Sequence, residues 1–104
     1  MIRHIVAYRL VAEAPADKAE AIGQLKSVLE ALPAVIPHVL TLVVAPDLGS
    51  VDTHWDAVLV SEHTDEAELV AYQRHPAHEE ALQRINPLVD ARAVVDYAMT
   101  DASV

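Results

Sequence analysis

The stretch Ile2-Arg-His-Ile-Val-Ala-Tyr-Arg-Leu10 decides the fold, because it has the composition of a β-strand and apolar side chains on both faces. Its two alternating sets are Ile2, His4, Val6, Tyr8 and Leu10 on one side, and residues including Ile5 and Ala7 on the other. A sheet with one face in water alternates apolar and polar residues, and this strand does not. Both faces of its sheet are therefore expected to be covered.

The remaining segments predict how that sheet is built. Further strands are expected at 39–45, 55–63 and 93–100, and helices at 17–32 and from Thr64 or Asp65 onward, the latter split by Pro76 and stopped by Pro87. Asp17 with Glu20 three residues later predicts an acidic capping box at the first helix. The order β-α-β-β-α-β predicts an α+β, ferredoxin-like subunit with both helices on one face of an antiparallel sheet.

Two helices cover only one face of such a sheet. The third strand offers Ala57 and Leu59 on one side and Val58 and Val60 on the other, so it too is apolar on both faces. A second copy of the chain, related by a two-fold axis, is the simplest cover for the remaining face. The strands therefore predict a homodimer.

Length and composition exclude several classes of protein. The chain has 104 residues, which suits a single domain (1–104, with a core at about 2–100). Seven Lys and Arg against 16 Asp and Glu give a formal charge of −9, which argues against nucleic-acid binding and against docking on anionic membranes. With no Cys there is neither a disulfide scaffold nor a thiolate nucleophile. The N-terminus resembles neither a signal peptide nor a membrane span, so we expect a cytoplasmic location.

The stretch Ala71-Tyr-Gln-Arg-His-Pro-Ala-His-Glu-Glu80 is the best candidate for chemistry. Tyr72 is expected near the end of one helix and His78 in the first turn of the next. A histidine titrates near neutrality and suits a general acid or base, and a tyrosine hydroxyl can stabilise a developing oxyanion. The alternative interpretation is structural: His75 caps a helix and Tyr72 belongs to the core.

The other histidines are less informative, apart from His4. His4 lies on an apolar strand, so its ring either bonds a buried neighbour or points into a cavity. His38, in a Pro-rich loop, and His54 and His63, which flank the third strand, are expected to be solvated.

A metal site built from His75, His78 and Glu79 is a further candidate, because their spacing could place three ligands on one helical face. His75 precedes Pro76, however, and is expected outside the helix, and no zinc-protease pattern is present. We therefore expect no metal ion at these residues.

Five segments also form a combined pattern: the strand with His4, Leu-Pro-Ala-Val-Ile-Pro at 32–37, Trp55-Asp56, Tyr-Gln-Arg-His-Pro-Ala-His at 72–78, and Val-Val-Asp-Tyr at 94–97. Together, from about Ile2 to Tyr97, they resemble the stress-responsive A/B-barrel (Dabb) family. The resemblance implies a ferredoxin-like subunit that forms a dimeric α+β barrel, in agreement with the homodimer argued from the strands.

The resemblance also implies a site. The family includes a plant polyketide cyclase, olivetolic acid cyclase, whose catalytic histidine and tyrosine match His78 and Tyr72 by position in the motif. His78 would then take a proton from an activated methylene, and Tyr72 would hold the carbonyl or stabilise the enolate. We expect His4, Tyr8 and Trp55 to contact the substrate, a small carbonyl or phenolic compound. The resemblance further implies an incidental magnesium ion near residues 32–39.

Two differences from the plant cyclase argue against a long-chain polyketide as the substrate of this protein. The chain has no Phe, whereas the plant enzyme lines its acyl pocket with bulky aromatic residues, and Ala57 stands where that enzyme has a third-strand histidine. Three interpretations therefore remain: a cofactor-free cyclase or aldol-type enzyme, a non-catalytic stress or ligand-binding protein, and a monooxygenase-like enzyme in which Trp55 supplies a redox-active aromatic ring.

Overall fold

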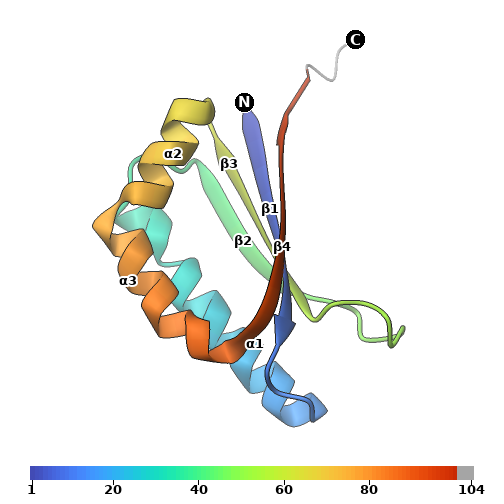
Figure 1. Ribbon diagram of the computed structural model, residues 1–104. Helices are drawn as coiled ribbons and strands as arrows, with labels where there is room; N and C mark the ends of the chain where they lie inside the picture. Colours follow the sequence, from blue (N-terminus) through green and yellow to red (C-terminus); the bar gives the residue numbers. More distant parts are fainter. Residues whose placement is uncertain (101–104) are drawn as a thin grey trace.

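The computed structural model describes residues 1–100 (Figure 1). Its elements, in chain order, are β1 (Ile2–Leu10), α1 (Pro15–Leu29), the 3₁₀ turn η1 (Leu32–Ala34), β2 (Thr41–Pro46), β3 (Ala57–His63), α2 (Glu66–Arg74), α3 (Pro76–Ile85), the 3₁₀ turn η2 (Asn86–Leu88) and β4 (Val89–Ala98). In this part of the chain no helix is long and apolar enough to cross a membrane.

The four strands form one antiparallel sheet in the order β2-β3-β1-β4. All three helices lie on the same side of it, and the opposite face is uncovered (Figure 1). The predicted ferredoxin-like α+β subunit is confirmed, with the second helical region divided into α2 and α3.

The two faces of the sheet differ in what covers them. On the helix side His4, Val6, Tyr8 and Leu10 of β1 are all buried. On the other side the strand register aligns one apolar residue from each strand: Val43, Val60, Ile5 and Val95. Val43 is 53% exposed and Val95 61% exposed in the single chain. The uncovered face is thus an apolar band that spans the sheet.

The first helix begins earlier than its sequence pattern predicts. The prediction of a capping box at Asp17 is wrong, because α1 starts at Pro15. Its N-cap is Ala14, and no side chain caps it. Proline suits the first helical position, since the missing N–H would have no partner there. The helix ends at Leu29, and the predicted last residue, Leu32, opens η1 instead.

The break between α2 and α3 is at the expected place. The carboxylate of Asp65 caps α2 by accepting a hydrogen bond from the Glu68 N–H (2.8 Å). His75 is extended, ends α2 and caps α3, because its Nδ1 accepts a hydrogen bond from the Ala77 N–H (3.0 Å). The capping interpretation of His75 is therefore confirmed.

Three predicted strand boundaries shift by two to four residues, because pairing partners rather than local composition set them. The second strand begins at Thr41, the third at Ala57, and the fourth at Val89, where Val89 pairs with Leu10 beyond an irregularity in the register. Trp55 therefore lies in the β2–β3 loop. The earlier start of β4 also places Arg92 on a strand.

Asp56 connects the end of β1 to α1 beside the β2–β3 loop. Its side chain accepts a hydrogen bond from the Leu10 N–H (2.8 Å) and pairs with Lys18 of α1 (2.9 Å). Burial raises the pKa of Asp56, but the Leu10 N–H and Lys18 outweigh burial and hold the pKa below its usual value. One carboxylate therefore joins β1, α1 and the start of β3.

Candidate active site

Four aromatic rings form a continuous row from the sheet to the helices. His4 of β1 lies 6.3 Å from His63 of β3, His63 lies 4.9 Å from Tyr72 of α2, and Tyr72 lies 4.7 Å from His78 of α3, measured between ring centroids. We call these four residues the His–Tyr cluster. The cluster unites three residues that the sequence indicated as site residues, His4, Tyr72 and His78, with one that it did not.

His63 is that additional residue, and the expectation that it is solvated is wrong. It is completely buried. Its Nδ1–H donates to the carbonyl oxygen of His38 (2.8 Å), which leaves Nε2 to accept from the Ser61 hydroxyl (2.8 Å). Both ring nitrogens are thus satisfied in the neutral form, and burial lowers the pKa of His63. The strand alternation Ala57, Leu59, Ser61, His63 was the signal that places it on the buried face.

His4 lines a cavity, as one of the two expectations had it, and its hydrogen-bond partner is an exposed carboxylate rather than a buried neighbour. His4 itself is buried, and its Nδ1 pairs with Asp96 of β4 (2.5 Å). The Asp96 carboxylate fixes which ring nitrogen of His4 carries a proton and how the ring is oriented.

The cavity lies between the helix side of the sheet and the three helices and has a volume of about 140 Å³. Three residues of the His–Tyr cluster reach it, together with polar and aliphatic neighbours. Its lining is His4, Val6, Tyr8, Leu29, Leu59, Tyr72, Gln73, His78, Leu82, Arg92 and Val94. It is a largely apolar pocket with a few polar groups, as is typical of small-molecule sites.

His78 has the properties of a general base. Its Nδ1 is buried and has no hydrogen-bond partner among the described residues. Burial and the charge of His4 lower the pKa of His78, and the backbone of Gln73 partly opposes them. The lowered pKa favours the neutral ring, and its Nδ1 has no partner in residues 1–100.

The two tyrosines of the cavity are hydrogen-bond donors rather than bases. Burial, with Tyr8 as a secondary cause, raises the pKa of Tyr72 far above its usual value. Burial also raises the pKa of Tyr8, against the opposing positive charge of Arg92. Both hydroxyls keep their protons at neutral pH, so each can donate to an oxygen that becomes negatively charged.

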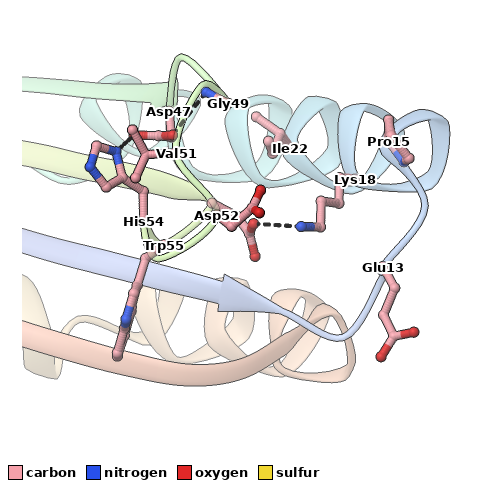
Figure 2. Close-up of a pocket in the computed structure, with 11 residues that line it drawn as sticks. Glu13, Pro15, Lys18, Ile22, Asp47, Gly49, Val51, Asp52, His54 and Trp55 are labelled. Atoms are coloured by element: carbon pink, nitrogen blue, oxygen red, sulfur yellow. Dashed lines mark hydrogen bonds and ion pairs between the residues drawn. The ribbon is translucent and has the colours of Figure 1, made fainter.

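Trp55 is the one predicted substrate-binding residue that lies apart from this cavity. Arg9 stacks on its ring, with the guanidinium carbon 4.7 Å from the ring centroid. It borders a separate pocket of about 320 Å³ between the start of α1 and the β2–β3 loop. Figure 2 shows this pocket, where Asp47 bonds to the exposed His54, and Trp55 points away from Lys18. The walls of this second pocket are strongly acidic, including Glu13, Asp47, Asp52 and Asp56.

The two segments that the sequence suggested for metal binding do not form a metal site in the described residues. In residues 1–100 no three His, Asp or Glu side chains are grouped closely enough to hold a metal ion. Residues 32–39, where the resemblance implies magnesium, contain no carboxylate, and the carbonyl oxygens of Leu32 and His38 already accept hydrogen bonds from Ile36 and His63. This donor set does not fit a magnesium ion. His38, expected to be solvated, is half-buried and pairs with Glu68 (2.8 Å).

Comparison with known proteins agrees with this architecture. A dimeric ferredoxin-like protein of unknown function from Thermobifida fusca is 33% identical, with 94% of this chain and 90% of that chain covered and a TM-score of 0.75. A dimeric protein of unknown function with a ferredoxin-like fold from Bacteroides fragilis is 28% identical, with 94% and 95% covered and a TM-score of 0.82. No curated protein matches the sequence significantly.

Two enzymes share the fold at low identity. A hydroxynitrile lyase from Passiflora edulis is 17% identical, with 97% of this chain and 94% of that chain covered and a TM-score of 0.75. An antibiotic biosynthesis monooxygenase is 16% identical, with 97% and 100% covered and a TM-score of 0.71. At these identities the likeness concerns the fold alone.

The family model of the stress responsive A/B barrel domain matches residues 2–99, nearly the whole chain. The match agrees with the strand order, with the helices on one face and with the motifs around His4 and His78. The chain belongs to the stress responsive A/B barrel domain family.

Proposed function

We propose that this protein is a cofactor-free acid–base enzyme that removes the proton next to the carbonyl group of a small molecule and so makes or breaks a carbon–carbon bond of the aldol type. The observation that carries the proposal is the pairing of His78 with Tyr72 at one cavity. A neutral imidazole with an unpartnered nitrogen there meets a hydroxyl that keeps its proton.

The residues divide the chemistry between them. His78 takes the proton from the carbon next to the carbonyl, and the electron pair of that C–H bond moves toward the carbonyl oxygen. Tyr72 donates a hydrogen bond to this oxygen as its negative charge develops. The enolate carbon then attacks a second carbonyl carbon, and the protonated His78 returns its proton to the new alkoxide. In the reverse direction the same groups cleave the bond.

The cavity volume limits the size of the reacting group. An engineered protein cavity of about 150 Å³ holds one benzene molecule, and this cavity is about 140 Å³. The reacting part of the substrate is therefore about as large as one six-membered ring. The chain also has no Phe with which to line a pocket for a long acyl chain.

The monooxygenase-like interpretation has less support than the other two. A monooxygenase-like reaction relied on Trp55, which lies outside the cavity. The hydroxynitrile lyase of the same fold supports the proposed enzyme only by analogy of fold. A non-catalytic ligand-binding protein would have the same cavity but would not turn anything over, and the experiment below separates the two.

Proton abstraction is measured with cyclohexanone in D₂O, because loss of the α-proton NMR signal reports each abstraction and needs no knowledge of the natural substrate. We expect the wild type to accelerate exchange, and His78→Gln to slow it by about 100-fold or more, as is typical for loss of a general base. His54→Gln, a change of the exposed histidine in the β2–β3 loop, is the matched control and leaves exchange unchanged. Wild-type exchange at the buffer rate would exclude the enzymatic interpretation.

We further infer that the working form is a homodimer joined through the uncovered face of the sheet. The apolar band of Val43, Val60, Ile5 and Val95 supports this, since a monomer would leave it in water. Similar solved structures from two bacteria are described as dimeric. The cavity lies on the opposite side of the sheet, so this association leaves it with its own helices.

A further inference from the structure

The cavity has an electrostatic character unlike the rest of the protein. The chain carries 16 acidic residues against 7 Lys and Arg, yet no carboxylate of residues 1–100 lines the cavity. Its titratable lining groups are His4, Tyr8, Tyr72, His78 and Arg92. The described lining therefore carries one permanent positive charge and no negative one, which favours a negatively charged ligand over a cationic one.

Arg92 is the source of that local positive charge. It lies on β4 directly opposite Tyr8, and its guanidinium carbon is 5.9 Å from the Tyr8 ring centroid. Its Nη2 donates to the side-chain oxygen of Asn86 (2.5 Å), so a residue of η2 orients the guanidinium.

The charge of Arg92 is not neutralised within the described part of the chain. The ion pairs of residues 1–100 use Arg3, Lys18 and Lys26 as their Lys and Arg members, and Arg92 is in none of them. A guanidinium has five N–H donors; the side-chain oxygen of Asn86 accepts from one, and the Tyr8 hydroxyl is a further hydrogen-bond partner. Because Arg92 is also exposed at the cavity wall, its other donors are open to a ligand.

We propose that Arg92 binds a carboxylate of the substrate, so that the protein acts on small oxo acids whose carbonyl group lies in the cavity beside Tyr72 and His78. The inference rests on the proposed function, because it names the residue that binds the carboxylate end of the substrate whose carbonyl group reacts at His78. A guanidinium suits this role, since its planar donors match the two oxygens of a carboxylate. Placing the anion on exposed Arg92 keeps it hydrated, while the ring and carbonyl enter the apolar part of the cavity.

The test compares two ligands of the same shape, 4-oxocyclohexanecarboxylate and 4-oxocyclohexanecarboxamide, by NMR titration. We expect the wild type to bind the carboxylate at least about tenfold more tightly than the amide, the difference that one charged hydrogen bond supplies. Arg92→Met should abolish this preference, and Arg92→Lys, which keeps the charge but loses the planar fork, should retain part of it. Arg84→Met, at an exposed position of α3 outside the cavity, makes the same change in net charge and should keep the preference.

The outcomes separate this inference from the proposed function. Equal binding of the two ligands by the wild type, or a preference that survives Arg92→Met, would overturn the role of Arg92 whatever the protein does to cyclohexanone. A preference that depends on Arg92, without exchange of cyclohexanone or of either ligand, would support the anion site and overturn the enzymatic proposal. Backbone NMR spectra of each variant show whether it is folded, and Arg92→Lys decides the matter if Arg92→Met is not.

Discussion

The rings of Tyr72 and His78 meet edge to face with their centroids 4.7 Å apart, although the two residues lie on different helices. Residues six positions apart in one unbroken helix point about 120° away from each other. The break at His75 and Pro76 removes that constraint, because His75 is extended and a new helix starts at Pro76. The His-Pro sequence therefore brings the two candidate catalytic groups together.

The division of roles predicts different effects for the two residues. Tyr72→Phe removes one hydroxyl and keeps the ring, so the variant should fold normally and slow α-proton exchange of cyclohexanone by about 100-fold, as the loss of an oxyanion donor does. The pH at which the exchange rate is half-maximal should not move, because His78 still supplies the base. A Tyr72→Phe variant with wild-type exchange would show that Tyr72 only fills the core, the alternative considered from the sequence.

Most of the frame was predictable because local signals determine it. The bounds of β1, the cap at Asp65 and the break at Pro76 follow from residues next to one another in the sequence. The contacts between the residues of the site could not be predicted in this way. His4 meets Asp96 across a strand pairing that joins residues far apart in the chain, and no local pattern reveals that register.

Other parts of the site were missed for identifiable reasons. His63 stands at the end of its strand, where composition favours exposure, but the strand alternation places it on the buried face. Arg92 was expected before the fourth strand, and only the earlier start of β4 at Val89 puts it at the cavity. Trp55 was associated with the site by its residue type, and its loop holds it elsewhere.

Asp56 is expected to be important for stability. Asp56→Asn keeps the shape but weakens the hydrogen bond from the Leu10 N–H and the pairing with Lys18, which should cost about 1.5–3 kcal/mol of unfolding free energy. Asp52→Asn, in the exposed β2–β3 loop, is the matched control and should change stability by less than about 0.5 kcal/mol. Urea unfolding of both variants measures the difference, and equal midpoints would contradict the role given to Asp56.

Acid should destabilise the fold at a pH well above that at which carboxylates titrate. The pKa values of His63 and His78 are lowered in the folded state, chiefly by burial, from an ordinary value of 6.5. Their neutral forms are therefore preferred in the fold, and stability is fully present above pH 6.5 and declines as the pH falls below it. Thermal unfolding of the wild type should show a lower midpoint at pH 5 than at pH 7. In His78→Gln this loss should be smaller, and a wild-type midpoint that is constant or rises on acidification would contradict the assignment.

The uncovered face of the sheet should respond to charge if it joins two subunits. Val95→Glu places a carboxylate at the β4 end of the apolar band, so it should convert a dimer into a folded monomer. Val51→Glu changes an exposed valine of the β2–β3 loop and should leave the mass unchanged. Light scattering coupled to size-exclusion chromatography measures both, and a Val95→Glu variant that remains fully dimeric would place the interface elsewhere.

The central claim, that a neutral His78 is the base, is tested most directly by the pH dependence of α-proton exchange of cyclohexanone. Because burial lowers the pKa of His78 from its ordinary 6.5, the rate should rise through a single ionisation below pH 6.5 and stay constant from there to pH 8. His78→Gln should abolish this titration together with most of the rate. A profile that still rises above pH 7, or one that His78→Gln leaves unaltered, would show that another group takes the proton.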